Sequence, residues 1–103
     1  MAMLGMERRS PPVVLILHMP GCGWCKQVIG PKGSGAKLKR AIVLEIDNEH
    51  PLVSLLRISS FPAILLCTPT RLLEYAKGER DSDSLQAWID AVTAFFIERP
   101  SDK

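Results

Sequence analysis

Two cysteines separated by two residues, Cys22 and Cys25, constrain this chain more than any other feature of its sequence. They lie in the stretch 19–26, which directly follows the apolar run 13–18. That run is aliphatic on both faces, which predicts a strand covered from both sides. A helix can start at the motif, with its first free N–H groups near Cys22. A Cys-x-x-Cys pair can form a disulfide that closes a small ring, or it can bind a metal ion. At a strand-to-helix junction, such a pair predicts a site of thiol chemistry.

The length and the cysteine count favour one intracellular domain. A chain of 103 residues, 47% of them hydrophobic, suffices for a single core and leaves little room for a second domain. Three cysteines are too few for a secreted disulfide framework, and one pair plus a leftover thiol suits a reducing compartment. No apolar run approaches the ~20 residues of a membrane span, and the run 13–17 is too short for a signal-peptide core. We therefore expect a cytoplasmic protein without a membrane partner.

The formal net charge of +2 is too small to indicate a nucleic-acid partner. The charge is unevenly distributed, because Glu7 is the one acid before residue 45, whereas acids outnumber bases from Glu45 onward. The plain interpretation is two solvated faces of opposite sign. The sharper interpretation is that bases near the motif favour a thiolate and acidic partners.

The order of the predicted elements indicates an α/β fold with a four-stranded mixed sheet and helices on both faces, in the order β-α-β-α-β-β-α. A helix after the motif runs through 26–29, is interrupted by the glycine-rich stretch 30–35, and recovers a turn within 36–40. A short helix has Pro51 in its first turn, and the last helix is capped by Asp81, Ser82 or Asp83 and ends at Pro100. The last two strands are joined by a short turn, which predicts an antiparallel hairpin. The predicted strands are 13–18, 41–46, 63–67 and 71–76, within a domain spanning 13–98 between a flexible tail at 1–12 and a C-terminal tail at 99–103.

Four pieces of the sequence, in order and spacing, resemble the thioredoxin superfamily. The pieces are the strand leading into 22–26, the strand ending at 46–47, the segment 58–63, which looks like the family's cis-proline loop, and the segment 75–88, which is similar to the last strand and helix of protein-disulfide-isomerase-type domains. The resemblance covers 13 to about 97 and implies a thioredoxin-like fold. The short segment before the first strand makes the topology closer to the minimal glutaredoxin-like core.

The chain departs from the family pattern around the motif. Ile16 stands where thioredoxins place a buried acid, and Val43 stands in place of the lysine that faces it. These replacements remove the family's usual route for handling the proton of the second cysteine. Gly21 replaces the tryptophan commonly found before the first cysteine, and the aromatic Trp24 precedes the second, as in many glutaredoxins.

The site residues follow from the motif and from the resemblance. We assign Cys22 as the attacking thiol, because a helix N-terminus and Lys26 favour its thiolate, and Cys25 as the resolving thiol. The resemblance implies a cis peptide bond before Pro62 and a substrate strand that pairs with the backbone of Phe61. We expect Trp24 to be exposed beside Cys22. The expected substrate-binding residues are Gly21, Trp24, Phe61 and Pro62.

Three other side chains receive plainer interpretations. Trp88 lies on the apolar stripe of the last helix and is expected in the core. His18 is expected to be an ordinary residue at a strand end. Cys67 is expected to be a buried, inert thiol.

The leading hypothesis is a monomeric thiol–disulfide oxidoreductase. Cys22 would attack protein disulfides, a thioredoxin-reductase-like protein would donate electrons, and the reversible Cys22–Cys25 disulfide would be the redox group, with no other cofactor. One alternative is a metal or iron–sulfur module built on the two cysteines, with His18 as a third ligand or with a second subunit and glutathione completing the set. Another is a redox-inactive binding module, which the missing acid–lysine pair suggests.

Overall fold

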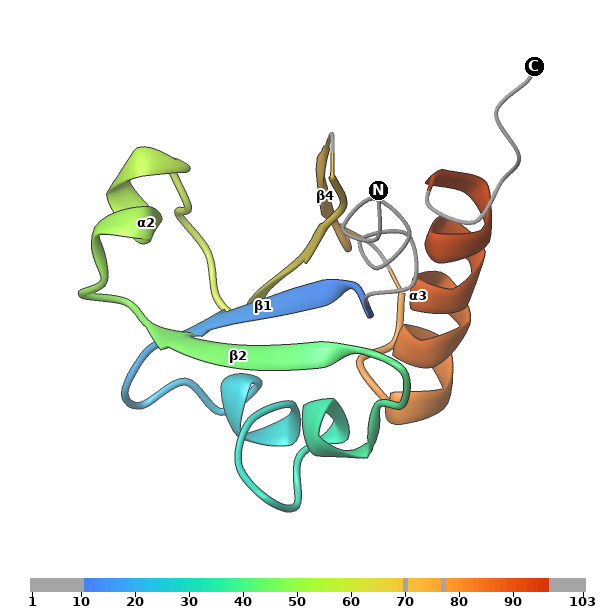
Figure 1. Cartoon of the computed structure of the whole chain (residues 1–103). Coiled ribbons are helices and arrows are strands. Elements are labelled where there is room, and N and C mark those ends of the chain that lie inside the picture. The colour runs from blue at the N-terminus through green and yellow to red at the C-terminus, as the bar shows by residue number, and fades with distance from the viewer. Residues whose placement is uncertain (1–10, 70, 77, 97–103) are drawn as a thin grey trace.

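The computed structural model describes residues 11–69, 71–76 and 78–96, and within them the chain forms a four-stranded sheet (Figure 1). The strands lie in the order β2-β1-β3-β4. β1 pairs in parallel with β2 and antiparallel with β3, and β3 pairs antiparallel with β4. The mixed sheet and the antiparallel pairing of the last two strands are therefore confirmed. The strand bounds are β1 Val13–His18, β2 Ile42–Asp47, β3 Ala63–Cys67 and β4 Leu72–Glu74.

The helices differ from the expected ones mainly after the motif. α2 and α3 lie where the capping signals predict, and Pro51 opens α2. In place of an α-helix over 26–29, the chain has one turn of 3₁₀ helix, η1, and a second short turn, η2. Most of the predicted N-terminal tail, all of the C-terminal tail and the predicted helix end at Pro100 lie outside the described residues. The helix bounds are η1 Cys25–Gln27, η2 Ser34–Lys37, α2 Pro51–Leu55 and α3 Ser82–Phe96.

Close backbone contacts explain why the motif helix stops after one turn. The Gly35 N–H donates to the Val28 carbonyl at 2.9 Å, so this carbonyl bonds a residue seven positions on instead of the next helical turn. A Cβ atom at Gly35 would lie 2.7 Å from Ile16 Cδ1 and 2.8 Å from the Val28 oxygen. Only glycine allows the chain to fold back this tightly against its own backbone. Gly30 turns the chain at a φ of +83° before this contact.

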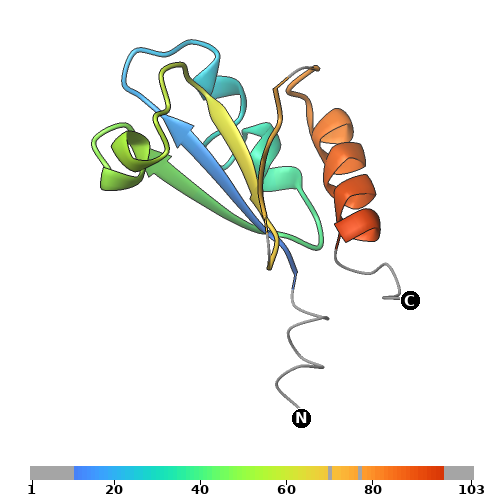
Figure 2. The ribbon, with the colours of Figure 1, turned by 90° about the horizontal axis from the view of Figure 1, so that it is seen from above.

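The two faces of the sheet carry separate apolar clusters, with α2 and α3 on opposite sides (Figure 2). The cluster on the α3 side is fully buried and receives Val28 from the motif segment and Leu85 and Ile89 from α3. Trp88 packs against this cluster, which confirms its predicted place. The remaining buried members come from the strands: Val14, Ile16, Ile64 and Leu66.

The face toward α2 is covered less completely. Leu17, Ala63 and Leu65 are buried there, with Leu52, Leu56 and Phe61 among the residues packed against them. The short α2 helix leaves the far end of this face open, where Ile42, Leu44 and Leu72 are 46%, 47% and 44% exposed. None of the helices in the ranges that the structure describes is long and apolar enough to cross a membrane.

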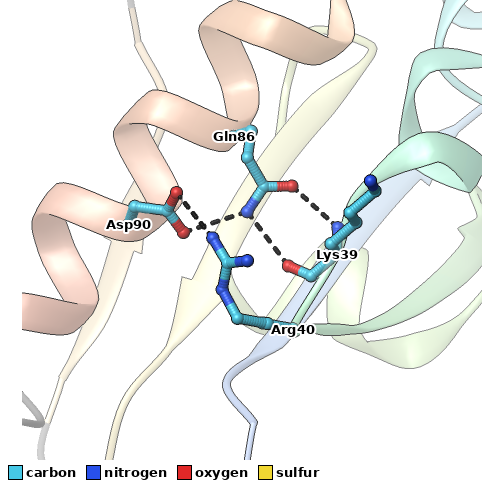
Figure 3. A network of polar contacts seen from close by, with 4 residues as sticks. All are labelled: Lys39, Arg40, Gln86 and Asp90. Carbon is cyan, nitrogen blue, oxygen red and sulfur yellow. Dashed lines mark hydrogen bonds and ion pairs between the residues drawn. The ribbon is translucent and has the colours of Figure 1, made fainter.

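A polar network ties the connection before β2 to α3 (Figure 3). The Gln86 side chain accepts a hydrogen bond from the Lys39 backbone N–H at 2.7 Å and donates to the Lys39 carbonyl at 3.0 Å. The same amide donates to Asp90 at 3.0 Å, and Arg40 forms an ion pair with Asp90 at 3.0 Å. α3 is thus fixed to the rest of the domain by polar bonds as well as by its apolar side.

Candidate redox site

The two cysteines follow the C-terminal end of the central strand β1. The Cys22 N–H donates to the Met19 carbonyl at 3.3 Å, which closes a turn directly after the strand. Gly21 lies in this turn at a φ of +78°, a backbone conformation that favours glycine. Cys22 and Cys25 form a disulfide with their Cα atoms 5.2 Å apart.

The two sulfur-bearing residues differ in exposure. Cys22 is half-buried, whereas Cys25 is 1% exposed. The Cys25 backbone N–H donates to the Cys22 sulfur at 3.1 Å. The expected stabilisation of a Cys22 thiolate by a helix dipole must be corrected, because one turn of 3₁₀ helix lacks the aligned peptides of a long helix. The hydrogen-bond donor that the structure provides for the Cys22 sulfur is the backbone N–H of Cys25.

The proline loop lies against the first cysteine. The Phe61–Pro62 peptide bond is cis, as the resemblance implies. The Phe61 carbonyl oxygen lies 3.7 Å from the Cys22 sulfur, and Pro62 is buried while Phe61 is half-buried. The structure therefore brings together residues that are 39 positions apart in sequence.

Trp24 has a partner that the sequence did not indicate. Its side chain is 61% exposed, as expected, and the Arg80 guanidinium carbon lies 5.8 Å from the centroid of its ring. This distance is within the range of a cation–π contact. Arg80 was part of the resemblance to isomerase-type domains, but no signal in the sequence joins it to a residue 56 positions earlier.

No acid or base is buried within the ranges that the structure describes, so no acid–base pair lies in the core beneath the cysteines. Ile16 is fully buried, and Val43 packs against the same cluster, so neither replaced position is compensated in place. Among the described residues, Ser34 is the one polar side chain that is buried. Lys26 is exposed, and Gly21 is exposed at the rim of the site.

Neither His18 nor Cys67 takes part in the Cys22–Cys25 disulfide. His18 is half-buried at the end of β1, and no group of three His, Cys, Asp or Glu side chains in the described part of the chain could hold a metal ion. Cys67 is a free thiol whose pKa is raised by burial, which suits an inert role. The burial of Cys67 is partial and not complete as expected, because the sheet face toward α2 is incompletely covered.

Solved structures similar to this chain include thioredoxin domains. No protein-family profile matches the chain. The first thioredoxin domain of mouse protein disulfide-isomerase A4 superposes with a TM-score of 0.65 at 25% identity, over 86% of this chain and 68% of that chain. A thioredoxin from Halobacterium salinarum superposes with a TM-score of 0.66 at 22% identity, over 90% of this chain and 85% of that one.

One curated relative is similar in sequence. The chain is 28% identical over 104 aligned residues to an Oryza sativa subsp. japonica protein described as a probable chloroplastic 5′-adenylylsulfate reductase. The alignment covers 87% of this chain but spans only 21% of that protein's length. Fold, disulfide and neighbours together define the chain as a thioredoxin-like domain with a Cys-x-x-Cys disulfide.

Proposed function

We propose that the chain is a thiol–disulfide oxidoreductase that acts on protein disulfides. The observation that carries the proposal is the asymmetry of the pair: an accessible Cys22 beside the Phe61–Pro62 loop, and a nearly buried Cys25 one turn below it. An attacking sulfur must reach a substrate, whereas a resolving sulfur only has to reach its neighbour. The disulfide bond between Cys22 and Cys25 shows that the sulfur of Cys25 can reach that of Cys22.

The proposed cycle transfers two electrons from the protein dithiol to the substrate disulfide. In the reduced protein the Cys22 thiolate attacks one sulfur of a substrate disulfide, so that a mixed disulfide forms and the other substrate sulfur leaves as a thiolate. Cys25 loses its proton and attacks Cys22, which releases the second substrate thiolate. The substrate ends as a dithiol, and the protein ends with the Cys22–Cys25 disulfide. The reverse steps oxidise a dithiol.

The proline loop supplies the proposed binding surface. Phe61 lies against Cys22, and an extended segment whose backbone pairs with Phe61 would carry its own sulfur toward Cys22. Trp24 and Gly21 would form the exposed rim of this surface. Buried Pro62 would keep the loop rigid, so that less freedom is lost when a substrate binds.

A redox titration in glutathione buffers, read by alkylation and mass, tests the proposal. We expect a reversible two-electron couple that Cys22→Ser and Cys25→Ser each abolish and that Cys67→Ser leaves unchanged. A couple below about −250 mV indicates a reductant, and one near about −180 mV indicates an oxidant or isomerase. In addition, Cys25→Ser should accumulate the mixed disulfide with a substrate, whereas the Cys22→Ser variant should not.

A redox-inactive binding module is the second candidate, because the residues described behind Cys25 offer no buried acid or base. Absence of any reversible couple would overturn the oxidoreductase and favour this alternative. The oxidoreductase proposal includes three further points: the protein works in the cytoplasm, it is a monomer, and a reductase of the thioredoxin-reductase type returns it to the reduced state. The cytoplasmic location is supported by the free Cys67 thiol, which suits a reducing compartment.

A further inference from the structure

The Arg80 side chain lies beside the redox site, and no ion pair joins it to a carboxylate within the part of the chain that the structure describes. Its guanidinium stands over the ring of Trp24, two residues after Cys22. The ion pair found among the described residues joins Arg40 and Asp90 and does not involve Arg80. Asp81, the next residue, is engaged elsewhere: its carboxylate accepts hydrogen bonds from Ser84 N–H at 3.0 Å and from Ser84 Oγ at 2.8 Å.

Contacts of Tyr75 hold the backbone directly before Arg80. The Tyr75 hydroxyl donates to the Glu79 carbonyl at 2.6 Å, and the Tyr75 ring lies 5.1 Å from that of Trp88 on α3. Gly78 adopts a φ of +122° between them, and a Cβ there would collide with the Tyr75 hydroxyl. Arg80 follows directly on the backbone that Tyr75 fixes. From this backbone the Arg80 guanidinium reaches the ring of Trp24.

The segments that carry Cys22 and Phe61 contain no acidic side chain, whereas Glu79 and Asp81 flank Arg80 in the chain. Across residues 19–31, Lys26 is the only charged side chain, and the loop 58–62 contains no charged residue. A guanidinium recognises a carboxylate through two parallel hydrogen bonds from its N–H edge, whereas a contact with an aromatic ring uses its face. An anion that reaches Arg80 therefore meets no acidic side chain from residues 19–31 or 58–62.

We propose that Arg80 and Trp24 together form a carboxylate-binding platform, which gives the site a preference for disulfides flanked by Asp or Glu. The inference rests on the proposed oxidoreductase function and adds its substrate class. An acidic side chain one or two positions from the attacked sulfur pairs with Arg80 while the peptide rests on Trp24. The chemistry is that of the cycle above: the peptide disulfide gains two electrons and becomes a dithiol, and the Cys22–Cys25 dithiol becomes the disulfide.

Matched peptides test the platform. Three peptides share one internal disulfide and differ only in the residue beside one cysteine, which is Glu, Gln or Lys. The reduced full chain is mixed with each peptide, and the second-order rate constant of peptide reduction is measured. We expect the order Glu, Gln, Lys, with about threefold between successive peptides at low salt, the scale of one exposed ion pair. The spread should narrow at 1 M salt, where such pairs are screened.

Substitutions of Arg80 and Trp24 test whether these two residues cause the preference for the Glu peptide. Arg80→Gln should equalise the Glu and Gln peptides, Arg80→Lys should retain part of the difference, and Trp24→Leu should reduce it. The control is Lys39→Gln, which removes one exposed positive charge next to the start of β2, at the end of the sheet opposite Cys22. It should leave the order and spacing of the three rates unchanged.

The possible failures are distinguishable. If the wild-type chain reduces none of the peptides, the oxidoreductase function itself fails. If it reduces all three at the same rate, the function stands and the platform is overturned. If Arg80→Gln slows all three by one common factor, Arg80 acts on the protein's own thiols and the substrate preference is again overturned. Circular dichroism of each variant establishes that a lost preference does not arise from unfolding.

Discussion

At the residue scale, the surroundings of Cys25 determine how fast a mixed disulfide can be resolved. Cys25 is 1% exposed, and Ser34 is the one buried polar side chain in the part of the chain that the structure describes. No buried acid or base there can accept the thiol proton. We therefore expect the proton to leave to water or to the departing substrate sulfur, and a free thiol is mostly protonated below its ordinary pKa of about 8.5.

The rate of resolution should consequently depend steeply on pH. We expect it to fall about tenfold for each pH unit below neutrality, because only the thiolate attacks. Rapid-quench measurement of mixed-disulfide decay gives this rate, and the Cys25→Ser variant isolates the preceding attack by Cys22 on the same substrate. A rate that stays flat between about pH 6 and about pH 8 would show that another group takes the proton.

Gly35 offers a test of the tight contact that ends the motif helix. Gly35→Ala should lower the free energy of unfolding by about 1–3 kcal/mol, because the new Cβ would overlap Ile16 Cδ1 and the Val28 carbonyl oxygen. Gly23→Ala is the matched control, since a Cβ there meets nothing within 4 Å, and it should stay within about 0.5 kcal/mol of the wild type. Urea unfolding measures both, and equal losses would refute the packing argument.

At the element scale, α3 depends on the cap at its start. The carboxylate of Asp81 accepts hydrogen bonds from the backbone and side chain of Ser84, and these bonds lower the pKa of Asp81 from its ordinary value of 3.8. A carboxyl whose pKa is lower in the folded state stabilises the fold above the unfolded value. The contribution is lost as the pH falls through the lowered folded value.

Asp81→Asn isolates the charge of this cap, because asparagine caps helices about as well as aspartate. The wild type should melt at a higher temperature than the variant at neutral pH. The difference should shrink once the pH falls below the ordinary value of 3.8 and the Asp81 carboxylate takes up its proton. Thermal unfolding of both proteins across this range measures it, and a difference independent of pH would contradict the assignment.

The network between α3 and the start of β2 makes a second prediction at this scale. Gln86→Ala removes two hydrogen bonds to the Lys39 backbone and should cost about 1–2 kcal/mol. Arg40→Gln breaks the Arg40–Asp90 ion pair, but the two side chains are 70% and 45% exposed, so the loss should stay below about 1 kcal/mol and decrease in salt. Gln27→Ala, at an exposed position on η1, is the control for Gln86. A larger effect at Arg40 than at Gln86 would contradict this ranking.

Elements with local signals could be predicted from the sequence, and elements shaped by distant contacts could not. β3 and α2 follow from aliphatic runs, a proline and capping residues that act within a few positions. The one-turn η1 helix depends on the approach of Gly35 to Ile16 and Val28, which no local propensity encodes. In the site, the cysteines and the cis-proline followed from motif and resemblance. The Arg80–Trp24 contact did not, because it joins two loops through the tertiary fold.

At the scale of the whole molecule, the domain is a sheet with one well-covered face and one partly open face. The face toward α3 is covered by the motif segment, η2 and α3. The face toward α2 has a five-residue helix for cover and leaves Ile42, Leu44 and Leu72 exposed at its far end. The apolar free energy of folding is therefore concentrated on the α3 side.

Two adjacent residues of β3 measure this difference directly, because Leu65 faces α2 and Leu66 faces α3. They are 4% and 0% exposed, so a comparison of burial alone predicts the same cost for both substitutions. We expect Leu66→Ala to cost about 3–5 kcal/mol, since a rigid and fully enclosed cluster cannot close the cavity. Leu65→Ala should cost about 2–3 kcal/mol, because the shorter cover and half-exposed neighbours can collapse toward the gap or admit water. Urea unfolding curves of the two variants give the losses. Equal values, or a larger one at Leu65, would mean that α2 encloses its face as firmly as α3 does.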